Sequence, residues 1–290
     1  MTTFLQLVLN GLMLGGLFAI VSVGLTLIFG IIRLVNFAHG ELLMVGMYAV
    51  FLLTTHLGLH PYVTAIPVVV LFFLIGMAIQ RFLIQPLLAA RDEHIQIFAT
   101  VGLSTALINL ALMVFGADIM NTPASGLRTA IEVGPFRVLL GQLVMLVVGV
   151  LLVIGLQLFL DRTQTGRAIR ATAQHRDAAR LMGVDVNWIY MITFGIGAAC
   201  VGLAAALVAP LYPVQPTVGT YFVLTAFVVV VLGGMGSLWG ALVGAMIIGL
   251  VDSLSGFYLG ADLREVATFA IFILILIFRP EGLFGLGRTA

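Results

Sequence analysis

The sequence predicts an all-α polytopic membrane protein that forms a single transmembrane domain over residues 1–290. Three observations carry this prediction. Hydrophobic residues make up 62% of the chain and charged residues only 9%, a composition that soluble globular domains do not reach. The apolar residues form long runs of the length that crosses a bilayer as a helix. The basic residues gather in a few short loops, which fall on one side of the membrane when the runs alternate in direction.

About nine hydrophobic segments follow one another along the chain, and the count ranges from eight to ten according to how the short runs are divided. In order, they cover residues 4–32, 42–57, 62–82, 95–115, 138–160, 188–209, 221–232, 238–251 and 266–278. The basic loops at 81–91, 162–180 and 279–288 all lie on the same side of this arrangement. Because basic loops stay in the cytoplasm, the N-terminus is expected outside and the C-terminus inside.

The longest polar stretch between apolar runs covers residues 161–187, and it holds five of the 13 basic residues. We therefore expect it to be a cytoplasmic loop. Its pattern predicts two short helices, one starting at Thr165 and one over residues 176–182. Asp177 near the start and Arg180 near the end of the second helix suit the helix dipole. Gly183 suits the left-handed position that closes a helix.

Such a loop favours a docking element that fits a groove in a cytoplasmic partner. The alternative is a solvated hairpin that only obeys the distribution of positive charge. The residues expected to contact such a partner share this stretch; they are Gly166, Arg167, Arg176, Asp177, Ala178, Arg180, Leu181, Met182 and Gly183.

A weak internal repeat predicts broken or re-entrant helices. In each half an apolar run meets a break, then a polar residue that can cap a helix, then a glycine-spaced apolar run; these polar residues are Asn36 and Ser237. Broken helices at membrane depth need cover from protein or a water-filled cavity. Ordinary loops are the alternative, with Asn36 as a cap and Glu41 complementing the helix dipole. The residues expected near a translocation path are Asn36, His39, Gly40, Gly233, Gly234, Gly236 and Ser237.

Several kinds of chemistry are excluded by residue content. All 13 basic residues are arginine, so the chain lacks the lysine of a phosphate-binding P-loop, and any ATP must be bound by a partner. A serine protease built on Ser104 would need a later membrane histidine, but the next one is His175 in the polar loop. His56 and His60 lack a nearby third ligand, so no metal site is predicted. No catalytic residue is expected.

Four blocks of the sequence resemble motifs of a known family. They are GLTLIFG at 24–30 leading to NFAHG at 36–40, TGRA at 165–168 leading to ARLMG at 179–183, VVLGGMGS at 230–237 followed by Gly240, and RPEGLFG at 279–285. Their order is similar to that of the permeases of branched-chain amino acid ABC importers, specifically the LivH-type member of the LivH/LivM pair. The blocks span almost the whole chain.

The resemblance implies an ABC importer permease fold, LivHM/RbsC-like, in a bacterial inner membrane. It implies a pore shared with a second, M-type permease subunit, two ABC ATPase subunits that bind the ATP, and an extracytoplasmic substrate-binding protein. It also implies that the loop ending at Gly183 contacts an ATPase. Importer permeases often carry a Glu-Ala-Ala start in this loop, whereas this chain reads Ala-Thr-Ala at 171–173. The resemblance therefore does not assign the individual residues that contact the ATPase.

The expected function is that of a non-enzymatic permease subunit that translocates leucine, isoleucine and valine. A urea or short-amide ABC permease is the alternative within the same class. A secondary transporter should show paired intramembrane carboxylates, which the sequence lacks, and a channel for a small neutral solute would show flux without ATP. The net charge of +1 gives no reason to expect a nucleic-acid partner.

Overall fold

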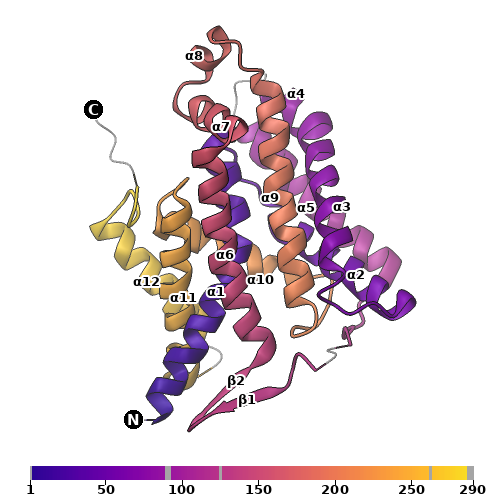
Figure 1. Cartoon of the computed structure of the whole chain (residues 1–290), viewed down its shortest axis with the longest axis vertical. Helices are drawn as coiled ribbons and strands as arrows, with labels where there is room; N and C mark the ends of the chain where they lie inside the picture. The colour runs from indigo at the N-terminus through magenta and orange to yellow at the C-terminus, as the bar shows by residue number, and fades with distance from the viewer. Residues whose placement is uncertain (1, 89–92, 124–125, 261–262, 286–290) are drawn as a thin grey trace.

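The computed structural model describes residues 2–88, 93–123, 126–260 and 263–285, and these are mostly helical (Figure 1). Seven helices in the described ranges are long and apolar enough to cross a membrane. They are α1 (Thr2–Ile32), α2 (His39–Leu57), α3 (Ala65–Ile79) continued by the π-helical turn η1 (Gln80–Ile84) and α4 (Gln85–Leu88), α5 (Glu93–Phe115), α6 (Leu140–Arg162), α9 (Val186–Val208) and α11 (Leu238–Tyr258).

Two further apolar helices are shorter, α10 (Val218–Gly233) and α12 (Arg264–Phe278). Each of the nine apolar runs of the sequence thus contains a helix, which confirms the polytopic helical fold. The polar stretch forms α7 (Gln164–Gln174) and α8 (Arg176–Leu181). These two helices lie at the end of the molecule opposite the N-terminus (Figure 1).

The fold is built around α1, whose residues are almost all buried from Gly11 onward. It packs along α11, α6, α9 and α10. Glycines allow the close approach: a Cβ on Gly15 would lie 2.8 Å from the Met246 Cα of α11, and a Cβ on Gly24 would lie 2.5 Å from the Gly197 carbonyl oxygen of α9. Membrane helices use small residues in this way because association there depends on close packing rather than on the hydrophobic effect.

The chain turns back into the fold after α1. Arg33 takes a left-handed backbone conformation (φ 57°), which is uncommon for a residue other than glycine. An irregular segment then leads to α2, and His39 Nε2 lies 2.9 Å from the carbonyl oxygen of Val21. Val21 precedes the end of α1 by eleven residues, or about 16 Å along the axis. Helix α2 therefore begins deep inside the fold.

Helix α10 begins at the same place. The backbones of Gly40 in α2 and Gly219 in α10 are in direct contact. At its far end α10 reaches the loop in which Gly236 packs against Gly30 of α1. Helices α2 and α10 therefore both begin at one point inside the fold, and they run from it toward opposite ends of the molecule. This agrees with the broken helices predicted from the sequence.

The pairing of the internal repeat differs from the prediction. The sequence pattern matched the break before α2 with the break before α11, but the contact between Gly40 and Gly219 matches α2 with α10. The neighbours agree with this: α1 packs along α11, and α3 packs along α9. Two sets of helices, α1–α2–α3–α5 and α9–α10–α11–α12, thus occupy corresponding places. The glycine-rich run at 233–236 gives the start of α11 a strong local signal, whereas α10 begins after Pro210, Pro213 and Pro216.

The predicted capping roles have different outcomes. Ser237 caps α11, because its Oγ accepts a hydrogen bond from the Gly240 N–H at 3.0 Å. Asn36 does not cap α2, for which the N-cap residue is Ala38. Its Oδ1 instead accepts from the Ala38 N–H at 3.1 Å and stabilises the turn that leads into the helix. Glu41 lies in the first turn of α2, as expected.

One element departs from the all-α prediction. Between the apolar runs that end at 115 and begin at 138, β1 (Ala130–Val133) and β2 (Phe136–Leu139) form an antiparallel hairpin with Ala130 opposite Leu139. The hairpin lies near the N-terminus of α1 (Figure 1). There the Gln6 side chain accepts from the Arg137 N–H at 3.0 Å and donates to the Arg137 carbonyl oxygen at 2.7 Å.

Candidate functional site

The polar loop is a structured pair of helices, as the sequence predicted. Thr163, rather than Thr165, caps α7, because its Oγ accepts from the Gly166 N–H at 2.9 Å. Gly166 is buried against the backbone of Phe159 and Leu160 at the end of α6. Arg167 follows with an exposed side chain. The glycine therefore lets α7 fold tightly onto the end of α6.

Helix α8 projects its apolar side into solvent. The side chains of Leu181 and Met182 are 88% and 84% exposed, the highest exposures among the large apolar residues of this loop. Arg176, Asp177, Ala178 and Arg180 are also exposed. Two adjacent large apolar side chains at the tip of the loop are thus left uncovered by the described part of the chain.

The ends of α8 match their predicted chemistry. The His175 ring accepts from the Ala178 N–H at 3.2 Å and caps the helix. Asp177 and Arg180 form an exposed ion pair at 3.8 Å. Gly183 has a φ of 84°, the left-handed conformation expected of a residue that closes a helix.

The opposite side of α7 is anchored to the membrane helices. Ile169 is 1% exposed and belongs to a core cluster with Ile31 and Ile32 of α1 and with Val186 and Ile189 of α9. Helix α7 therefore packs directly on the two central helices, α1 and α9. The geometry therefore suits a coupling element.

The first break, at Asn36, His39 and Gly40, is enclosed by protein. Asn36 is 1% exposed and His39 is 0% exposed. In the described part of the chain, Nδ2 of Asn36 and Nδ1 of His39 have no hydrogen-bond partner. Buried polar atoms of this kind are few in native proteins and call for an explanation.

The second break lies elsewhere. Gly233, Gly234, Gly236 and Ser237 follow the far end of α10, where Gly233 accepts a hydrogen bond from the Phe284 N–H at 3.0 Å. The 14 residues from Gly219 to Gly233 separate the two breaks by about 20 Å along a helix axis. The structure therefore does not bring the two sets of predicted path residues together.

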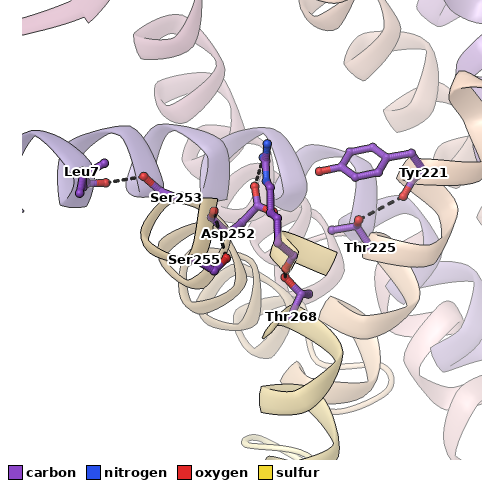
Figure 2. A network of polar contacts seen from close by, with 8 residues as sticks. Leu7, Tyr221, Thr225, Asp252, Ser253, Ser255 and Thr268 are labelled. Atoms are coloured by element: carbon purple, nitrogen blue, oxygen red, sulfur yellow. Dashed lines mark hydrogen bonds and ion pairs between the residues drawn. The ribbon is translucent and has the colours of Figure 1, made fainter. Parts of the chain in front are cut away.

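Sequence reasoning missed two polar groupings that join helices far apart in the chain. In the first, the side chains of Ser104 on α5 and Thr220 on α10 lie near the Glu41 carboxyl group. In the second, Arg264 of α12 pairs with Asp252 of α11, and Tyr221 and Thr225 of α10 lie nearby (Figure 2). The only sequence signal for these groupings is a polar residue inside an apolar run, and this signal does not identify the residue with which it interacts.

A cavity of about 850 Å³ opens beside the second grouping, near the N-terminus of α1. Its polar lining includes Gln6, Asn10, Arg137, Gln142, Asp252 and Arg264. Both charges of the central pair are already matched, because Arg264 donates to both oxygens of Asp252.

Comparison with known proteins agrees with this architecture. The model of the family described as the branched-chain amino acid transport system / permease component matches residues 7–278. The high-affinity branched-chain amino acid transport system permease protein BraD of Pseudomonas aeruginosa is 31% identical, with 97% of this chain and 96% of that protein covered. The corresponding LivH protein of Escherichia coli is 31% identical with the same coverage.

A further relative is less similar in sequence. The probable branched-chain amino acid transport permease protein LivH of Methanocaldococcus jannaschii is 27% identical, with 97% of this chain and 92% of that protein covered. No solved structure matches the chain. The family match over nearly the whole length, together with the polytopic helical fold, establishes that this chain is a membrane protein of the branched-chain amino acid transport permease family.

Proposed function

We propose that this chain is a pore-forming subunit of an ATP-driven importer that carries leucine, isoleucine and valine across a bacterial inner membrane. The observation that carries the proposal is the likeness over 97% of the chain to permeases named for high-affinity branched-chain amino acid transport. The proposed partners are an M-type permease subunit, two ABC ATPase subunits and an extracytoplasmic substrate-binding protein. The chain itself is proposed to perform no catalysis and to bind no ATP.

We also propose an orientation. The end that carries α7 and α8 faces the cytoplasm, with the C-terminus on the same side and the N-terminus outside. Its support is the density of arginine in the loop, five of 13 in the chain, because positively charged loops remain in the cytoplasm. The apolar tip at Leu181 and Met182 then points toward the proposed ATPase subunits.

The proposed mechanism is a mechanical relay. Closure of the ATPase pair moves α8, and α7 passes the displacement to α1 and α9 through the packing around Ile169. Coupling of this kind requires contacts that differ between two states of the complex. The first break, at Asn36, His39 and Gly40, is proposed to lie beside the path, and the second, at Gly233–Ser237, to lie nearer the coupling end.

The test is transport by a reconstituted complex. The chain would be purified together with its partner permease and ATPase subunits, placed in liposomes and supplied with the binding protein. Leucine uptake that requires both ATP and binding protein would support the proposal. Leucine flux without ATP would replace it with a channel or a secondary carrier, and ATP-driven uptake of urea or acetamide in place of leucine would replace its substrate.

A further inference from the structure

An acidic side chain lies at the internal point from which α2 and α10 depart. Glu41 is 2% exposed, and the hydroxyl groups of Ser104 and Thr220 lie beside its carboxylate. In the described part of the chain its Oε2 has no hydrogen-bond partner, and Glu41 takes part in none of the ion pairs formed there. Burial of an unpaired carboxylate is costly, so the protein retains an acceptor here with unused capacity.

Polar side chains interrupt the apolar surface near this side chain, where Val101 on α5 and Leu224 on α10 are exposed. On α10, Thr217 before the helix and Thr220 in its first turn are exposed. Ser104 on α5 is half-buried, and Asn109, further along the same helix, is exposed. Ser104 and Thr220, both partly accessible, thus form a polar rim beside the buried Glu41 side chain.

Helix α5 leaves this face largely open. Among the other membrane helices it packs mainly on α2, and a Cβ on Gly102 would meet no atom within 4 Å. Ionisable side chains inside membrane proteins face the protein interior or a water-filled cavity rather than lipid. The polar rim over Glu41 therefore belongs to a surface that another subunit or water covers in the assembled protein.

From this we infer that the face formed by α5 and the first turn of α10 borders the translocation path, and that Glu41 receives the ammonium group of the passing amino acid between Ser104 and Thr220. The inference rests on the proposed function, which supplies a zwitterionic solute and a second permease subunit to close the path. An ammonium group needs an acceptor where the dielectric constant is low. A carboxylate without a cationic partner is that acceptor, and it distinguishes an amino acid from a neutral solute.

The first experiment measures transport by the full complex with Glu41→Gln. The amide preserves the size of the side chain, so the complex should still assemble. Leucine uptake should fall by about tenfold or more, which corresponds to about 1.4 kcal/mol of lost stabilisation. Glu132→Gln, in the exposed ion pair of the hairpin, is the matched control and should transport normally. Wild-type uptake by Glu41→Gln would overturn the role of Glu41.

The second experiment does not depend on the stability of a Glu41 variant. Thr220→Cys, made in a Cys200→Ser background, is treated with cationic and anionic water-soluble thiosulfonates during ATP turnover. The cationic reagent should react faster by about tenfold, because the neighbouring carboxylate attracts it. Leu151→Cys, on the exposed face of α6, is the lipid-facing control and should not react.

The outcomes separate this inference from the proposed function. If the complex imports leucine but Thr220→Cys reacts with neither reagent in any nucleotide state, the path lies elsewhere and the inference is wrong. If Thr220→Cys shows no preference for the cationic reagent, Glu41 does not act on cations in the path. If the wild-type complex does not import leucine, it is the proposed function that fails.

Discussion

Gly40 of α2 and Gly219 of α10 lie backbone against backbone, so neither position has room for a side chain. A Cβ on Gly219 would lie 2.5 Å from the Gly40 carbonyl oxygen. The contact sets the depth at which both helices begin. Since Glu41 and Thr220 are the next residues along their helices, it also places the carboxylate and the hydroxyl group side by side.

The first prediction concerns this contact. Gly219→Ala should lower the stability of the protein by about 1–3 kcal/mol, because an added methyl group would force the two backbones apart. Gly102→Ala is the matched control in another helix, since a Cβ there would meet no atom within 4 Å. Unfolding in detergent can be followed by reaction of a thiol-sensitive dye with Cys200, which is 4% exposed. Equal midpoints for the two variants would show that the contact is loose.

The second prediction concerns Asp252 and Arg264. The Arg264 Nε donates to Oδ1 at 2.5 Å and Nη2 donates to Oδ2, while the Asp252 side chain is 6% exposed and that of Arg264 is 36% exposed. Arg264→Gln leaves the buried carboxylate uncompensated. It should cost about 2 kcal/mol, less than the ~3–5 kcal/mol of a fully buried pair, because the arginine is partly hydrated.

The double variant provides the control for that pair. Asp252→Asn combined with Arg264→Gln removes both charges and should recover most of the lost stability. The same Cys200 unfolding assay measures all three variants. A double variant as unstable as the sum of the single ones would show that the two side chains act independently.

The third prediction concerns the tip of α8. Leu181→Asp places a charge at the most exposed large apolar side chain of the polar loop. It should weaken association with the ATPase subunits by about tenfold or more and remove substrate-stimulated hydrolysis in the complex. Membrane insertion should be normal, because the side chain contributes nothing to the core.

A matched variant tests whether the effect is specific. Leu259→Asp introduces the same charge at a side chain that is 56% exposed after α11, at the opposite end of the molecule. It should leave co-purification of the ATPase subunits unchanged. If Leu181→Asp assembles and transports at the wild-type rate, the loop is only a topological anchor.

The fourth prediction concerns the start of α9. The Asp185 carboxylate accepts hydrogen bonds from the N–H groups of Asn187 at 3.0 Å and Trp188 at 3.1 Å. Asp185→Ala should destabilise the protein by about 1 kcal/mol, the usual loss for a helix N-cap. Asp185→Asn retains an acceptor and should behave nearly as wild type in the same Cys200 unfolding assay. An alanine variant that unfolds with the wild-type protein would argue against the cap.

Local patterns in the sequence were sufficient for the secondary structure and the class of protein. Each apolar run contains a helix, because hydropathy and length are properties of the run itself. The two helices of the polar loop and the left-handed Gly183 follow from capping chemistry that acts over a few residues. The Ser237 cap was found for the same reason. The Asn36 cap was wrong because a turn competed for the same side chain.

The tertiary structure alone decided which helices meet. The apolar runs are similarly hydrophobic on all sides, so hydropathy does not tell one neighbour from another, and contacts inside a bilayer depend on where small residues coincide. That is why the pairing of α2 with α10 at Gly40 and Gly219 could not be read from the chain. The same holds for Glu41 between Ser104 and Thr220 and for Asp252 beside Arg264. A polar residue in an apolar run indicates that a polar partner is needed, but only the fold determines which residue that partner is.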